Sequence, residues 1–320
     1  MFKKINKIVI LLLTGIISLP AWAQPKIESI PYGNMDQWMS RKIEESFVIG
    51  GETKTIYEIA DKDLQIAQNT PYRNTQSPWA VSSVYARVHG ITKASVTVFP
   101  ERRGKGYAER LETKIEHVKV FGIINIYVLA SGTIFLGQMV EPITSTDNPH
   151  SNLITGIPFT KQPKALQYDY KVVTGGPSRK VNGFTDGEPT GTTDHAEVFI
   201  LLQKRWEDAQ GSVHALRIGT GWEKLTQTET SWQNKHQLKI HYGDITGKPF
   251  YKSYMALKKG SNANYTKNSK GKMVPIIEEG WGTKADGVTH LILQFSSSDG
   301  GPYIGNTHSK LWVDNVALVY

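Results

Sequence analysis

The sequence predicts an all-β protein, a β-sandwich of the jelly-roll type folded as one large domain with long loops. About ten short segments show the apolar alternation of strands. Turn residues such as Asp-Gly and Gly-Gly-Pro separate these segments. Helical periodicity is nearly absent, and residues 40–47 are the one predicted helix, of one or two turns. Many strands, regular turns and almost no helix together favour a sandwich or jelly roll.

The predicted elements follow one another along the chain without a repeat or a dividing linker. The polar segment 258–272 and the Gly-, Thr- and Pro-rich segment 175–194 are predicted as surface loops. We therefore predict a single domain over residues 24–320. The predicted strands cover residues 82–89, 94–99, 107–116, 122–130, 165–173, 196–206, 215–218, 236–242, 290–296 and 311–319.

The first 23 residues are predicted to be a signal peptide and not part of the domain. Three lysines precede a short apolar run over residues 8–19, and Ala21-Trp22-Ala23 fits the small-x-small cleavage rule. The run is too short to span a bilayer, and no later segment is long enough. The chain has no cysteine, which excludes disulfides and a lipid anchor on an N-terminal cysteine. We expect a periplasmic or secreted protein that is not a lipoprotein.

The net charge of +8 raises the question of an anionic partner. Three of the positive charges belong to the predicted signal peptide, and the remaining lysines and arginines are scattered, so binding of nucleic acid is not expected. The sequence has no Gly-x-Ser-x-Gly motif, phosphate-binding loop or His-Glu-x-x-His motif. The nine histidines are dispersed, which argues against a histidine metal site.

Three predicted strands, 107–116, 165–173 and 196–206, each alternate an apolar face with a face of charged and amide side chains. One interpretation is the solvated outer face of a sandwich. The other is a concave sheet whose polar groups and aromatic rings line a saccharide cleft. The predicted saccharide-binding residues are Trp79, Tyr107, Arg110, Asp169, Lys171, Gln203, Arg205 and Trp206.

Two carboxylates on neighbouring strands could perform the acid–base chemistry of a glycosidase. Glu112 and Glu197 are the candidates if the protein is an enzyme. Arg110, Lys171 and Arg205 could also bind the carboxylate of an acidic sugar.

The two ends of the chain resemble the first and last strands of carbohydrate-binding jelly rolls. Residues 33–38 (GNMDQW) and 311–318 (LWVDNVAL) carry this resemblance. It implies a structural calcium ion held by Asp36 and Asp314, although Asp36 replaces the usual Glu and Asn315 replaces a second acid. Oxygen ligands suit such a hard cation. The alternative is that Asp314 accepts hydrogen bonds from nearby backbone N–H groups.

Four further blocks extend the resemblance over most of the chain. They are residues 107–113 (YAERLET), 131–137 (SGTIFLG), 156–171 (GIPFTKQPKALQYDYK) and 296–316 (SSSDGGPYIGNTHSKLWVDNV). In order and spacing they resemble the putative carbohydrate metabolism domain family of Gram-negative bacteria. The resemblance implies a β-sandwich similar to those of glycoside hydrolases and carbohydrate-binding modules, with a pocket for sugar.

Three functions remain open from the sequence. The first is an exported protein that binds an oligo- or polysaccharide in a polar pocket for carbohydrate utilisation. The second is a glycoside hydrolase or polysaccharide lyase that uses carboxylates of the same face. The third is a surface structural or adhesion domain without a sugar pocket. Because binders and enzymes share this scaffold, the fold alone does not separate them.

Overall fold

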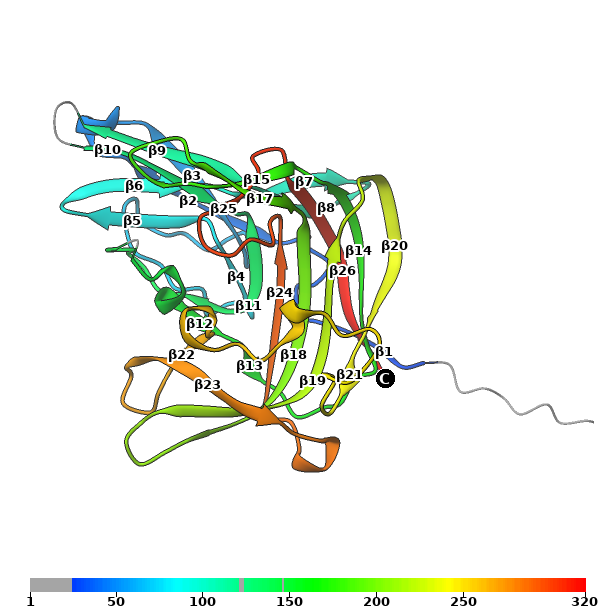
Figure 1. Ribbon diagram of the computed structural model, residues 1–320. Coiled ribbons are helices and arrows are strands. Elements are labelled where there is room, and N and C mark those ends of the chain that lie inside the picture. Colours follow the sequence, from blue (N-terminus) through cyan, green and yellow to red (C-terminus); the bar gives the residue numbers. More distant parts are fainter. Residues whose placement is uncertain (1–24, 121–123, 146) are drawn as a thin grey trace, which may run out of the picture.

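The computed structural model describes residues 25–120, 124–145 and 147–320. The predicted signal peptide lies outside this part of the chain. The described residues form an all-β fold, which confirms the predicted fold class (Figure 1). No helix among them is long and apolar enough to cross a membrane. The helical elements described are short 3-10 helices: η1 (Phe47–Ile49), η2 (Pro149–Asn152), η3 (Ser253–Met255), η4 (Gly260–Asn262) and η5 (Lys284–Asp286).

A six-stranded antiparallel sheet forms one side of the central sandwich, on the right in Figure 1. Apart from the β7–β8 hairpin, its pairs join segments that lie far apart in the chain. Their order is β20 (Glu229–Lys239), β14 (Ala165–Val173), β26 (Lys310–Val319), β8 (Gly106–Glu112) and β7 (Val98–Arg103), with β1 (Ile27–Ser29) also paired to β26.

A ten-stranded sheet forms the other side of the sandwich. Its pairs are antiparallel except that β19 and β23 run parallel. The main order is β12 (Leu153–Thr155), β11 (Thr133–Met139), β24 (His290–Ser296), β18 (Ala196–Glu207), β19 (Val213–Leu225), β23 (Met273–Trp281) and β22 (Tyr265–Lys267). Three short strands pair beside this path: β4 (Trp79–Val81), β13 (Ile157–Pro158) and β21 (His241–Tyr242).

Smaller sheets extend from one end of the sandwich, at the top of Figure 1. Two are three-stranded: β16 (Asn182–Gly183), β10 (Ile124–Ala130) and β9 (Lys114–Val120), then β17 (Glu188–Asp194), β15 (Gly176–Lys180) and β25 (Ile304–Gly305). Two are two-stranded: β2 (Trp38–Glu44) with β3 (Thr53–Ile59), and β5 (Val84–Val88) with β6 (Ile91–Ser95).

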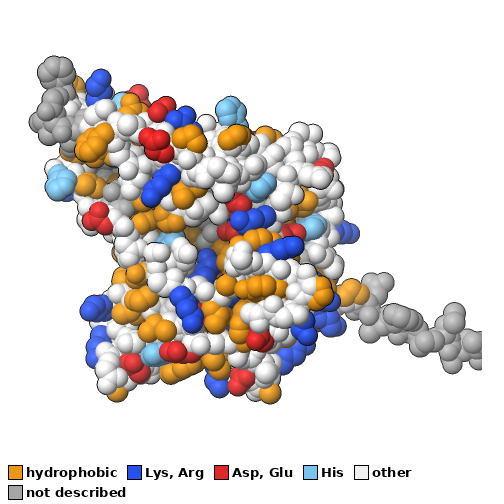
Figure 2. All heavy atoms as spheres, viewed as in Figure 1, with side chains coloured by type: hydrophobic (Ala, Val, Ile, Leu, Met, Phe, Trp, Pro, Cys, Tyr) orange, Lys and Arg blue, Asp and Glu red, His pale blue; other side chains and the backbone are white. Residues whose placement is uncertain are grey.

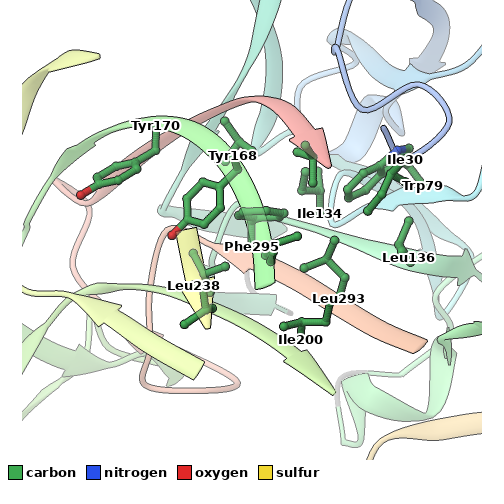
Figure 3. Close-up of a cluster of buried hydrophobic side chains, with 14 of the residues drawn as sticks. Ile30, Trp79, Ile134, Leu136, Tyr168, Tyr170, Ile200, Leu238, Leu293 and Phe295 are labelled. Carbon is green, nitrogen blue, oxygen red and sulfur yellow. The ribbon is translucent and has the colours of Figure 1, made fainter. Parts of the chain in front are cut away.

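The main hydrophobic core lies between the two large sheets. Alternate residues of each strand point into it, as the period of two requires. Tyr168 of β14 packs edge-on against Phe295 of β24, with ring centroids 5.1 Å apart, so the two sheets meet at these rings (Figure 3). The predicted apolar faces of 165–173 and 196–206 are confirmed, because Leu166, Tyr168, Tyr170 and Val172, and Val198, Ile200 and Leu202, all belong to this core.

One carboxyl group is buried on the inner side of the six-stranded sheet. Glu109 lies two residues before the core residue Leu111 in β8, so both side chains are on the same face, and Glu109 is fully shielded from solvent. Neither of its carboxyl oxygens has a hydrogen-bond partner among the described residues. Desolvation raises the pKa of Glu109 well above its ordinary value, because burial penalises the charged form.

The ten-stranded sheet curls until its first and last strands touch. Thr155 of β12 donates a hydrogen bond from Oγ1 to the carbonyl of Tyr265 in β22, at 2.8 Å. Asn148 donates from Nδ2 to the Tyr265 hydroxyl at 2.9 Å. The curl gives the sheet a concave face on the side away from the main core. In Figure 2 the surface over β11 and β24 is hollowed, and cationic and apolar side chains lie in the hollow.

Three local predictions were wrong. Residues 40–47 were predicted as a helix, yet they begin within β2, where Met39, Arg41 and Ile43 are buried alternately in the strand period. The predicted loop 175–194 contains β15, β16 and β17, and the predicted loop 258–272 contains β22. These polar strands lack the apolar alternation on which the predictions depended.

Candidate functional site

The concave face of the ten-stranded sheet is formed around β18. Glu197, Phe199, Leu201, Gln203 and Arg205 alternate there with the core residues of the same strand. Phe199 and Leu201 form a second apolar cluster with Trp222 of β19 and Ile292 of β24, which Ile245 and Met255 cover from the segment after β21. This cluster divides the face into an upper part near Glu197 and a lower part near Gln203.

Glu197 is a nearly buried carboxyl at the upper part of this face. It is 9% exposed, and Trp222 donates an indole N–H to its Oε1 at 2.8 Å. Desolvation raises the pKa of Glu197, and the negative charge of Asp299 adds to this. The charges of Lys258 and Lys224 and the Trp222 hydrogen bond act in the opposite direction. Glu197 therefore holds a proton at higher pH than an ordinary glutamate.

Lys258 brings an ammonium group onto the same cluster from the covering segment. Its Nζ lies 4.4 Å from the centroid of the Phe199 ring and 5.1 Å from that of Trp222. Desolvation lowers the pKa of Lys258 and Arg217 lowers it further, while Glu197 and Glu278 act in the opposite direction. On this cluster the pKa of the Glu197 carboxyl is therefore raised, while the pKa of the Lys258 ammonium is lowered.

The rim of the upper part adds a further aromatic ring and a further ion pair. Lys224 forms an ion pair with Asp299 at 2.8 Å, and its Nζ lies 4.8 Å from the centroid of Tyr254. The Tyr254 ring is 5.9 Å from Trp222, and His195 Nδ1 is 3.4 Å from Asp299 Oδ2. Tyr254 is partly exposed. We call Glu197, Trp222, Lys224, Tyr254, Lys258 and Asp299 the upper site.

The lower part of the concave face is a buried polar network. Glu278 of β23 accepts hydrogen bonds at 2.6 Å from Gln203 Nε2 and from Arg217 Nε. Its second oxygen pairs with the Arg217 guanidinium and accepts from the backbone N–H of Lys258. Arg205 donates to Gln203 and, across the curl, to the carbonyl of Thr155 at 3.0 Å. The network thus fixes the curvature and anchors the segment that carries Lys258.

Desolvation shifts two more groups in this network. It lowers the pKa of Arg205 to about 9, although Glu278 opposes the shift. It also lowers the pKa of His290 to about 4, with Arg205 contributing. Gln203 and Arg205, both predicted to bind saccharide, are engaged in this network. Gln203 is fully buried.

The predicted catalytic pair is split between the two sheets. Glu112 lies at the end of β8 in the six-stranded sheet and pairs with Arg110, Lys114 and Lys310. Glu197 lies on the concave face of the other sheet and has none of these partners. The structure does not bring the two carboxylates together.

Three predicted saccharide-binding residues, Arg110, Asp169 and Lys171, lie on the outer face of the six-stranded sheet. Arg103 forms ion pairs there with Asp169 at 2.8 Å and with Asp314 at 2.6 Å. Lys171 Nζ lies 4.6 Å from the centroid of Trp312. Arg110 pairs with Glu101 at 3.0 Å. The polar faces of the three predicted strands therefore do not share one cleft, because β8 and β14 belong to a different sheet from β18.

The three predicted aromatic residues lie in separate places. Trp79 is completely buried in the main core, and its Nε1 donates to the carbonyl of Pro31, so it cannot stack on a sugar. Tyr107 lies beside Arg102 on the β7–β8 hairpin. Trp206, 42% exposed, stacks on His214 beyond the concave face.

The carboxylates proposed for calcium have other partners. Asp36 accepts a hydrogen bond from the backbone N–H of Tyr107 at 2.9 Å, and Asp314 pairs with Arg103. Within the described part of the chain, no group of three or more Asp, Glu or His side chains could hold a metal ion. These donors do not fit a calcium ion shared by Asp36 and Asp314.

Five residues of the upper site were not among the predicted site residues. Tyr254 and Lys258 come from the segment after β21, and Lys258 lies in a run predicted to be a surface loop. Asp299 follows β24, and Lys224 faces Glu197 across the β18–β19 pair. Trp222 could have been found, because its position in the strand period places it opposite Phe199.

Two solved structures share similarity with the chain. One is described as a putative glycoside hydrolase from Bacteroides thetaiotaomicron, with 18% identity, coverage of 70% of this chain and 57% of that chain, and a TM-score of 0.41. The other, described as a putative glycoside hydrolase from Bacteroides vulgatus, has 18% identity, coverage of 69% and 76%, and a TM-score of 0.42. The chain thus spans little more than half of the first. No curated protein sequence matches.

A family model described as "Putative carbohydrate metabolism domain" matches residues 52–319. The match includes the ten-stranded sheet, the six-stranded sheet apart from β1, and the upper site. The chain therefore belongs to the putative carbohydrate metabolism domain family.

Proposed function

We propose that the protein binds a saccharide at the upper site of the concave face. Membership of a carbohydrate-related family supports a saccharide as the ligand class. The chemistry of the site supports the location, because sugar-binding pockets combine aromatic rings with a few placed polar groups. Tyr254 and Trp222 supply the rings, while Glu197 and Lys258 supply a hydrogen-bond acceptor and donor.

The observation that carries this proposal is the placement of Glu197 and Lys258 against one aromatic cluster. Both groups are desolvated, and each favours the charged form of the other: Lys258 lowers the pKa of Glu197, and Glu197 raises the pKa of Lys258. Hydroxyl groups of a sugar can accept from an ammonium and donate to a carboxylate, which makes charge-assisted hydrogen bonds. The C–H face of the same sugar can pack on the Tyr254 ring.

A glycan array followed by calorimetry tests the proposal. We expect the protein to bind at least one glycan, and Tyr254→Ala and Lys258→Met each to weaken that binding about tenfold or more, equivalent to roughly 1.4 kcal/mol. Lys171→Met is the matched control, because it removes a lysine that also lies over tryptophan rings but on the other sheet. No binding to any glycan, or equal losses in all three variants, would overturn the proposal.

A second candidate is glycoside hydrolysis with Glu197 as the general acid. The raised pKa of Glu197 favours it, because a glutamate that acts as general acid needs a pKa above that of an ordinary glutamate. Asp299 is the second carboxylate, and its charge contributes to that shift. In this case Glu197→Gln would abolish release of reducing sugar while the bound glycan stayed bound. Turnover that survives Glu197→Gln would exclude the hydrolytic role and leave binding in place.

Export belongs to the same proposal, since polysaccharides are encountered outside the cytoplasm. Expression of the full chain in a Gram-negative host, followed by fractionation and N-terminal sequencing, tests it. We expect the mature protein to begin after Ala23 and to be found in the periplasm or the medium. An uncleaved chain in the cytoplasm would contradict export without affecting the saccharide site.

A further inference from the structure

A cavity opens at the end of the six-stranded sheet where β14 begins and β20 ends, and it shares no residue with the upper site. Its volume is about 460 Å³. Its apolar walls are formed by Ala165 of β14, by Ile240 between β20 and β21, and by Tyr242 of β21. Three lysines surround it: Lys164 just before β14, Lys239 at the end of β20 and Lys284 in η5. Gln237 of β20 completes the lining.

The Tyr242 ring is held in a fixed position at this cavity. Its hydroxyl donates to the carbonyl of Pro163 at 2.6 Å, and the ring also packs against the main core. The Nζ of Lys284 lies 4.3 Å from the ring centroid. The cavity therefore has a rigid aromatic wall with a cation beside it, and binding needs no ordering of that wall.

The positive charge of the cavity is not neutralised by the protein. Lys164, Lys239 and Lys284 are exposed, and none of them forms an ion pair with a carboxylate in the described part of the chain. No Asp or Glu is among the lining residues. Lys161 nearby differs, because Glu28 pairs with it at 2.6 Å. Desolvation, together with the charge of Lys239, lowers the pKa of His241 next to the cavity.

Figure 2 shows that Lys and Arg side chains gather along this edge of the molecule, at the lower right over β1, β20 and β21. Three ammonium groups around a concave apolar wall would attract an anion and raise its local concentration. A flat anionic surface reaches the lysines but not the wall, whereas a sugar ring is small enough to enter a cavity of about this size. The wall therefore favours an anionic sugar over a membrane surface.

We propose that the cavity formed by Lys164, Lys239, Lys284 and Tyr242 binds an acidic saccharide that carries carboxylate or sulfate groups. The anionic groups contact the lysines, and the ring packs on Tyr242. The proposal is independent of the upper site, with which the cavity shares no residue. It gives the protein a second saccharide site with its own charge preference.

Calorimetric titration with polygalacturonate, heparin and neutral dextran tests this inference. The variant K164A/K239A/K284A removes the three cavity lysines, all exposed, so the fold should persist. The control K62A/K267A/K272A removes the same charge from three exposed lysines elsewhere. We expect at least one acidic polymer to bind wild type and the control equally, the cavity variant to bind it at least tenfold more weakly, and dextran to show no such difference.

Three outcomes would overturn the inference. Equal weakening in both triple variants would show that net charge alone attracts the polymer. If neither polygalacturonate nor heparin binds, this ligand class is excluded. Stronger, lysine-dependent binding to phosphatidylglycerol vesicles than to the polymers would assign the cavity to a lipid surface. None of these results bears on the upper site, because neither triple variant changes it.

Discussion

The outer face of the six-stranded sheet and the concave face of the ten-stranded sheet are built from the same residue types. On the first, Arg103 bridges Asp169 and Asp314, and Lys171 lies over Trp312. On the second, Glu197 and Lys258 lie against Trp222. In the first set each cation lies close to its carboxylates or ring. Burial raises a carboxyl pKa on both faces, and that of Asp314 on the first reaches about 6. On the second face desolvation raises the pKa of Glu197 and also lowers the pKa of Lys258.

The difference shows that curvature, more than composition, separates the two faces. The curl of the ten-stranded sheet and the segment carrying Met255 and Lys258 exclude water from the concave face. Low water content strengthens every charge interaction there and also penalises each charge. Paired charges on the six-stranded sheet are easier to satisfy, and they serve to hold neighbouring strands together.

The largest expected effect is at the base of the concave face. Arg217→Met leaves the Glu278 carboxylate buried without its main cation, and we expect the free energy of unfolding to fall by about 3–5 kcal/mol. The double variant R217M/E278M should recover a large part of the loss, since the uncompensated charge is gone. Urea denaturation measures both. A loss below about 1 kcal/mol for the single variant would show that this pair is not needed for the curl.

The next effect concerns Glu109, which lies on the inner side of the six-stranded sheet without a hydrogen-bond partner among the described residues. Its pKa is raised in the folded state, so the folded protein binds the proton more tightly than the unfolded chain. Stability is therefore greatest below the unfolded pKa of about 4.3 and falls as pH rises from there towards the folded pKa. Glu109→Met should remove this fall and stabilise the protein by about 1–3 kcal/mol at pH 7. The free energy of unfolding is measured from pH 4 to 8 in both proteins. The same dependence on pH in wild type and in Glu109→Met would contradict the prediction.

A smaller effect is expected at Arg103 on the six-stranded face. Desolvation raises the pKa of Asp314 to about 6, against the lowering effect of Arg103. The Asp314 contribution to stability therefore falls as pH rises from about 3.9 to the folded pKa. Arg103→Met should raise the Asp314 pKa further and cost about 1–2 kcal/mol at pH 7. Carboxyl NMR titration reads the shift directly, and an Asp314 pKa that falls in the variant would refute the assignment.

The smallest effect is expected at Lys171, whose ammonium lies over the rings of Trp232 and Trp312. Lys171→Met keeps the packing and removes the charge, so the cost should be about 0.5–1 kcal/mol. Thermal unfolding and tryptophan fluorescence measure it. A cost as large as that of Arg217→Met would mean that the two faces do not differ in the way described.

Local patterns predicted several apolar core strands well, and the polar strands and the site less well. The bounds of β14 and β24 agree with the predicted segments 165–173 and 290–296, and the apolar faces point inward as expected. Which strands share a sheet depends on pairs far apart in the chain, such as β8 with β26, and no local signal reports these. The split between Glu112 and Glu197 follows from this. Trp79 shows the same limit, since a tryptophan suits a core as well as a binding surface.

The contact between β12 and β22 has a consequence for association with other chains. A strand at the end of an open sheet presents unpaired N–H and C=O groups, to which another protein can add a strand. Here Thr155 reaches from one terminal strand to Tyr265 in the other, so the largest sheet covers its own ends. In the six-stranded sheet, β20 forms one edge, and its pairing with β14 is broken by two irregularities that disturb a continuous template. The fold thereby limits strand addition at the ends of its largest sheet and at the β20 edge of the six-stranded sheet.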